Sequence, residues 1–181
     1  GYSALSAEDD NGGNIAIGNL ALSTLNAGAD SYNVAIGFQA ARLMSTALGN
    51  VVIGGFAGDA LTSGHRNIAI GYEALSTEDA HGYNIAIGYR ALATQDAGVA
   101  AYNLAIGADA GRLITTGVEN TLIGGNAGDA LTIGNHNVAI GFEALSTSVD
   151  GDKNVAIGRR ALKVYEDGDG SGHNTAVGAN S

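Results

Sequence analysis

The residues with the most obvious chemical potential are acidic and lie in a glycine-rich stretch near the end of the sequence. The run Asp167-Gly168-Asp169-Gly170-Ser171 places oxygen ligands at alternate positions, as the opening of a calcium loop does. The bidentate Glu that closes an EF-hand is missing, because the twelfth position counted from Asp167 is Gly178. An EF-hand is therefore excluded. Asp167, Asp169 and Ser171 are left as candidates for a looser cation site, with a solvated acidic loop as the alternative.

No other pattern in the sequence favours catalysis. The four His residues (65, 81, 136 and 173) share neither a common phase nor the spacing of metal ligands, so we expect them at the surface. The sequence has no Cys, no Gly-x-Ser-x-Gly elbow and no phosphate loop, since neither Gly54-Gly55 nor Gly124-Gly125 is followed by Lys-Ser/Thr. We predict a protein that is not an enzyme and that needs no cofactor.

The whole sequence is built on a repeated five-residue motif, Asn-x-(Ala/Val/Leu)-(Ile/Val)-Gly. A recurring period of this kind is typical of a solenoid. Its Asn residues stand at positions 14, 33, 50, 67, 84, 103, 120, 137, 154 and 174. Three intervals of 17 follow each interval of 19, so four successive repeats form a larger unit.

The larger unit is duplicated. Residues 14–83 align without gaps on residues 84–153, with 39 identities among the 70 positions. Residues 1–13 and 154–181 are partial units in the same register. We therefore expect a single repeat array over residues 1–181 that belongs to a longer fibre.

The alternation within each motif predicts a short β-strand, because Ile68 and Ile70 point to one face and Ala69 to the other. If each repeat is one coil, the second aliphatic residues stack at about 4.8 Å as a continuous ladder. The ladder consists of Ile17, Ile36, Ile53, Ile70, Ile87, Ile106, Ile123, Ile140 and Ile157. The segments between glycines are too short for helices. We predict an all-β parallel solenoid of about ten coils of 17–20 residues.

Three further positions of the repeat have expected roles. The Gly after the ladder residue permits positive φ or a close backbone approach. An Ala three residues later indicates a tight contact, across the core or with a neighbouring chain, and we expect a second short strand around the following Ala-Leu. The Asn suits the turn into the strand, where stacked amides could bond from coil to coil.

Composition limits the possible partners. Eight Lys and Arg against 18 Asp and Glu give a net charge of −10, which disfavours nucleic acid and anionic membranes. The sequence contains no apolar run long enough to insert into a membrane. With 29 Gly, no Trp and 6% aromatic residues, a thin repeated core is favoured over one thick core.

Every fourth coil carries two or three extra residues, in the segments 25–32, 95–102 and 164–173. Loops on a rigid scaffold commonly carry function, so these loops are candidates for receptor contact, with loop drift in a duplicated fibre as the alternative. Their aromatic rings could stack on sugars or pack at coil corners. The candidate residues are Tyr32, Asp96, Tyr102, Tyr165, Asp167 and Asp169.

The run Asn-Val-Ala-Ile-Gly-Phe-Gln-Ala at 33–40, with its relatives at 67–74 and 137–144, resembles the head repeats of trimeric autotransporter adhesins. It is also similar to Ala-Ile-Gly arrays in phage tail fibres and bacterial surface proteins, which often precede an endosialidase-type chaperone domain. The resemblance implies a left-handed β-roll and a side-by-side homotrimer on a virion or cell surface. It implies cell adhesion through a glycan or protein receptor. The coils here are longer than those of the adhesin heads.

Two other classes of solenoid fit the repeat less well. A trimeric left-handed β-helix acyltransferase requires an aliphatic residue at every sixth position, but six and twelve steps from Ile70 reach Ser76 and Gly82. The third class is an ice-binding or ligand-binding solenoid; ice binding requires flat ranks of Thr, and pairs such as Ser76-Thr77 recur too sparsely. The sequence therefore favours a structural and adhesive fibre segment.

Overall fold

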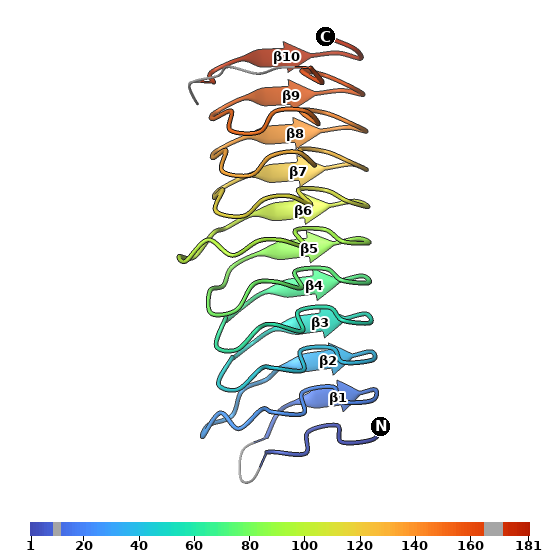
Figure 1. Ribbon diagram of the computed structural model, residues 1–181, viewed down its shortest axis with the longest axis vertical. Coiled ribbons are helices and arrows are strands. Elements are labelled where there is room, and N and C mark those ends of the chain that lie inside the picture. The colour runs from blue at the N-terminus through green and yellow to red at the C-terminus, as the bar shows by residue number, and fades with distance from the viewer. Residues whose placement is uncertain (9–11, 165–171) are drawn as a thin grey trace.

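The chain folds into one column of stacked coils, each contributing a single three-residue strand (Figure 1). The computed structural model describes residues 1–8, 12–164 and 172–181. Within these residues there is no helix, and so none that is long and apolar enough to cross a membrane. The strands are β1 (Ile15–Ile17), β2 (Val34–Ile36), β3 (Val51–Ile53), β4 (Ile68–Ile70), β5 (Ile85–Ile87), β6 (Leu104–Ile106), β7 (Thr121–Ile123), β8 (Val138–Ile140), β9 (Val155–Ile157) and β10 (Thr175–Val177).

The strands form one parallel sheet in chain order, from β1 to β10. Ile17 pairs with Ile36, Ile36 with Ile53, and the same register continues to Ile157 and Val177. The predicted parallel solenoid and its stacked ladder are therefore confirmed. At about 4.8 Å per strand, nine spacings give the sheet a height of about 43 Å.

The middle residue of each strand points into the interior of the column. Side chains alternate along a strand, so the middle residue and the ladder residue point to opposite faces. In β4, Ala69 is fully buried, whereas Ile68 and Ile70 on either side are only partly buried. The Ala three residues after each Gly is also buried, so Ala74 contacts the core of its own chain. The ladder consequently lies on the outer face of the sheet.

Side-chain size is balanced between the two walls in several coils. Where the middle strand residue is Ala69, the facing position four residues after the Gly is the buried Leu75. Where the strand residue is the larger Leu122, the corresponding position is Gly128, and a Cβ there would lie 2.9 Å from the Leu122 side chain. In these coils a large residue on one wall faces a small one on the other, which keeps the thin core closely packed.

The Gly that follows each strand has both a positive φ and a close backbone contact, as predicted. Gly71 has a φ of 136°, and a Cβ on it would lie 2.2 Å from the carbonyl oxygen of Gly88 in the next coil. The equivalent glycines from Gly18 to Gly158 have φ between 131° and 142°, with 2.1–2.5 Å to the next carbonyl oxygen. No other residue type fits this corner without separating the coils.

The expected second strand around the Ala-Leu segment is wrong. This segment forms turns, because residues two and four positions after the Gly adopt left-handed backbone conformations, as at Glu73 (φ 53°) and Leu75 (φ 51°). It is still bonded to both neighbouring coils. The Glu73 N–H donates to Gly55 O in the preceding coil, and the Leu75 N–H donates to Ala91 O in the following one.

The buried Asn residues form a continuous hydrogen-bond ladder, which confirms the expected bonding from coil to coil. Asn67 Oδ1 accepts from the Asn84 N–H at 2.9 Å, and the Asn67 N–H donates to Asn50 Oδ1 at 2.8 Å. The residue with positive φ in this turn is not the Asn but the one before it, for example Arg66 (φ 57°).

Candidate functional site

The outer face of the sheet is a continuous apolar surface. Each strand turns its first and third residues outward, and at these 20 positions 18 residues are Ile, Val or Leu and two are Thr. None carries a charge, although the chain has a net charge of −10. The parallel register lines these residues up in two columns along the whole sheet.

Aromatic side chains border this outer face along part of its height. On the side that follows the strands, Phe38, Phe56, Tyr72 and Tyr89 contact one another in sequence, with ring centroids 5.2, 5.9 and 5.8 Å apart. On the side that precedes them, Tyr83 and Tyr102 are stacked with their centroids 5.0 Å apart. Contact between rings supports the expectation that the repeated aromatics pack at coil corners.

The two long loops that the structure describes extend beyond the other coils, next to β1 and β5 in Figure 1. The glycines at their tips, Gly28 and Gly98, have the same φ of 68°, and a Cβ on either would meet nothing within 4 Å. Both loops therefore have similar tips with open space around them. They lie four coils apart, which is about 19 Å along the column.

The candidate receptor-contact residues of these loops are accessible. Tyr32 and Tyr102 are 66% and 55% exposed, and Asp96 is exposed as well. The Tyr32 hydroxyl donates to Asp30 Oδ2 at 3.3 Å. Tyr102 stacks on Tyr83, and Tyr83 accepts a hydrogen bond from the Arg66 guanidinium at 2.6 Å. The rings of Tyr32 and Tyr102 are therefore both exposed to solvent, but their neighbouring polar groups differ.

The remaining candidates, Tyr165, Asp167, Asp169 and Ser171, lie outside the described residues. The cation site proposed for that segment consequently stays a prediction.

The turns before β1 and β5 each use a Glu to complete the Asn ladder. In regular coils the Asn amide donates to a carbonyl 14 residues later, as from Asn67 to His81 O at 3.0 Å. In the coils with a long loop that donation is replaced by one to a Glu six residues earlier, from Asn14 to Glu8 and from Asn84 to Glu78. Glu78 is fully buried, and this burial raises its pKa to about 7.

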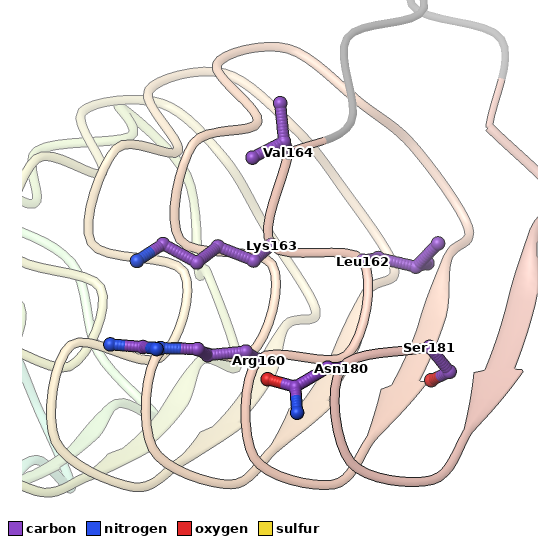
Figure 2. Close-up of a pocket in the computed structure, with 6 residues that line it drawn as sticks. All are labelled: Arg160, Leu162, Lys163, Val164, Asn180 and Ser181. Atoms are coloured by element: carbon purple, nitrogen blue, oxygen red, sulfur yellow. The ribbon is translucent and has the colours of Figure 1, made fainter.

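A hollow lies at the last coils and is lined by Arg160, Leu162, Lys163, Val164, Asn180 and Ser181 (Figure 2). Arg160 and Lys163 extend side by side in the same direction in this view. Both donate to Glu143 Oε2, at 2.7 and 2.6 Å, and these hydrogen bonds lower the pKa of Glu143. The two cations of the hollow are therefore already paired within the chain, which disfavours the hollow as an anion site.

Comparisons with protein-family models, with curated proteins and with solved structures find no match for this chain.

Proposed function

We propose that this chain is a structural and adhesive segment of a homotrimeric fibre on a cell or virion surface. The observation that carries the proposal is the uncharged aliphatic outer face of the sheet, continuous over ten strands. Its mechanical role is to hold the long loops at fixed spacing along a rigid column.

The size of this face favours self-association. Two columns about 7 Å apart, with their side chains, cover a strip of about 10 by 43 Å, or roughly 400 Å². The bordering aromatic rings raise this to roughly 800 Å². Soluble monomers rarely expose apolar patches beyond about 300–600 Å². Joining two such faces buries up to roughly 1,600 Å², the area of a typical specific interface.

A second copy of the same chain fits this face better than an unrelated partner does. The face repeats every coil, as the Ile ladder does, so an identical chain in the same register presents matching columns along the full height. The negative charges lie outside the two columns, so they do not meet there when copies associate. The number of three chains is taken from the resemblance to trimeric adhesin heads and tail fibres.

Three chains would present three copies of each long loop at the same height. Weak contacts with a host glycan or protein receptor then combine into stronger binding through multivalency. The exposed rings of Tyr32 and Tyr102 suit sugar stacking in such contacts.

The proposal is tested by absolute mass in solution, measured by light scattering on a size-exclusion peak. We expect three times the chain mass of 18.0 kDa. The variant Ile70→Asp places a charge in the middle of the outer face, and we expect it to lower the mass while the far-UV circular dichroism stays that of the wild type. Thr46→Asp is the matched control, because Thr46 is exposed and lies outside the strands.

Each other result bears on a different part of the proposal. A wild-type mass of two chains would keep the face as an interface but reject the trimer. A stable species with the mass of one chain would reject self-association through this face. An equal loss of mass in Ile70→Asp and Thr46→Asp would place the interface elsewhere.

A further inference from the structure

Four side chains capable of binding a metal ion meet where the second long loop begins. They are Glu78, Asp79, His81 and Asp96, and their ligand atoms all lie within 4.8 Å of one another. The first three precede β5, and Asp96 follows it. Within the described part of the chain, this is the one such group that combines carboxylates with an imidazole.

Two buried groups of this cluster are incompletely satisfied by the protein. Glu78 is fully buried, and its oxygens accept only from neutral donors, the His81 N–H at 3.0 Å and the Asn84 amide at 3.4 Å. His81 Nδ1 is buried without a hydrogen-bond partner and lies 3.6 Å from Glu78 Oε1. That separation is too long for a hydrogen bond but suits two ligands on one ion. A cation bound by both atoms would compensate the buried carboxylate and use the imidazole nitrogen.

We propose that Glu78, Asp79, His81 and Asp96 form a binding site for a divalent transition-metal ion of the Zn²⁺ type. Zn²⁺ takes imidazole nitrogen and carboxylate oxygen in four-coordinate sites. Ca²⁺ prefers six to eight oxygen ligands, so an imidazole among four ligands disfavours it.

The geometry requires only small movements. Metal–ligand bonds of about 2.1 Å in a tetrahedron place ligand atoms about 3.4 Å apart. The pair His81 Nδ1 and Glu78 Oε1 is already at 3.6 Å. Asp79 and Asp96 are exposed, so their side chains are free to rotate inward by about an ångström to close the site.

The position of the site suggests what the ion would do. Asp96 is the second residue of the 95–102 loop, whereas Asp79 is the equivalent residue one coil below. An ion shared by both would tie the base of the long loop to the preceding coil. The duplicated unit has Ser148, Val149 and Gly151 at the positions of Glu78, Asp79 and His81, so those positions supply no carboxylate or imidazole there.

The test is calorimetric titration of ZnCl₂ into the full chain at pH 7.5, without a polyhistidine tag and after EDTA has been removed by dialysis. We expect one Zn²⁺ per chain with a dissociation constant in the micromolar range or below. His81→Gln and Asp96→Asn should each weaken binding at least tenfold. His136→Gln is the matched control, because His136 also lies beside a carboxylate, Glu119, at 3.3 Å, but belongs to no larger cluster.

Thermal melting in EDTA separates loss of the site from loss of the fold. We expect Asp96→Asn and wild type to melt together in EDTA, and Zn²⁺ to raise the midpoint of the wild type more than that of Asp96→Asn. The absence of Zn²⁺ binding, equal weakening by His136→Gln, or tighter binding of Ca²⁺ than of Zn²⁺ would each overturn the proposal. All four ligands come from one chain, so a monomeric mass would reject the trimer without affecting this site.

Discussion

The substitution Gly71→Ala tests whether the close stacking of the corners holds the column together. The added Cβ would lie 2.2 Å from Gly88 O and 2.6 Å from its carbonyl carbon, so the two coils must separate by about an ångström. The separation strains the hydrogen bonds that join these two coils at the corner, from the Gly88 N–H to Ile70 O and from the Arg90 N–H to Tyr72 O, now 2.7 and 2.9 Å. The φ of 136° is also a conformation that Ala rarely adopts.

The expected cost follows from these contributions. Two weakened hydrogen bonds cost about 1 kcal/mol each, and the backbone strain adds about 2 kcal/mol, for a total of about 4 kcal/mol. For a chain of this size, about 1 kcal/mol shifts the melting midpoint by about 2–4 °C. We therefore expect Gly71→Ala to lower the midpoint by about 8–16 °C.

Two other glycines separate steric contact from backbone strain. Gly98→Ala has positive φ but open space around the Cβ, so it should cost about 1 kcal/mol or less. Gly12→Ala has neither feature and should be close to neutral. The assay is thermal melting by circular dichroism, at one protein concentration because self-association shifts the midpoint. If Gly71→Ala melts within about 3 °C of Gly98→Ala, the stacking argument is refuted.

Three further results are expected. Asn67→Ala leaves the buried Asn84 N–H and His81 C=O without their partners, so it should cost about 2–4 kcal/mol and speed hydrogen exchange at the Asn84 amide; unchanged exchange there would contradict the ladder. Leu75→Ala opens a cavity in the thin core and should cost about 2–5 kcal/mol in denaturant unfolding, whereas Leu43→Ala, at a partly exposed side chain, should cost much less. Burial raises the pKa of Glu78 from 4.5 to about 7, so the folded state favours the protonated form. The contribution of protonated Glu78 to the free energy of unfolding is fully present below pH 4.5 and is lost as pH rises through 7, a loss of about 3 kcal/mol. Melting from pH 4 to 9 in EDTA should show this loss in wild type but not in Glu78→Gln, and parallel curves would contradict the assignment.

The repeat alone was sufficient to predict the sheet and its register. A strict interval between Asn residues fixes which residues stack, and the invariant Gly and Ala follow from backbone contact and core thickness, as at Gly71 and Ala74. Which face of the strand points inward could not be predicted. In a strand such as Ile68-Ala69-Ile70 both faces are apolar, so hydrophobicity does not distinguish the interior from an outer face.

The error over the second strand has a physical origin. Left-handed backbone is normally signalled by Gly or Asn, but here it is adopted by residues such as Glu73, Leu75 and Arg90. Each costs about 1 kcal/mol, and the bonds to both neighbouring coils offset that cost. The conformation depends on neighbouring coils and not on the residue's own preference, so local sequence gives no signal for it.

The metal-ligand cluster was missed for a different reason. Asp96 was considered only as a residue of a long loop, although Asp79 lies one coil earlier and occupies the same position in the adjacent coil. His81 was assigned to the surface because His spacing was compared along the chain. In a solenoid, residues separated by one coil period lie next to each other in adjacent coils. Metal-ligand spacing should therefore be compared at that period, and not only along the chain.

The long loops and the buried Glu have a common cause. Lengthening a coil removes the carbonyl that would otherwise accept from the Asn amide below, and a buried amide without an acceptor is costly. Glu8 and Glu78 supply the acceptor from within the same coil, beneath the loops that follow β1 and β5. At the third such position Ser148 is present, and Asn154 Nδ2 has no partner among the described residues. The substitution of Glu for a lost carbonyl explains why a carboxylate is buried in so thin a core. Above its raised pKa, Glu78 is a buried carboxylate that accepts only from neutral donors, and the coil period brings Asp79 and Asp96 to the place where a compensating cation would bind.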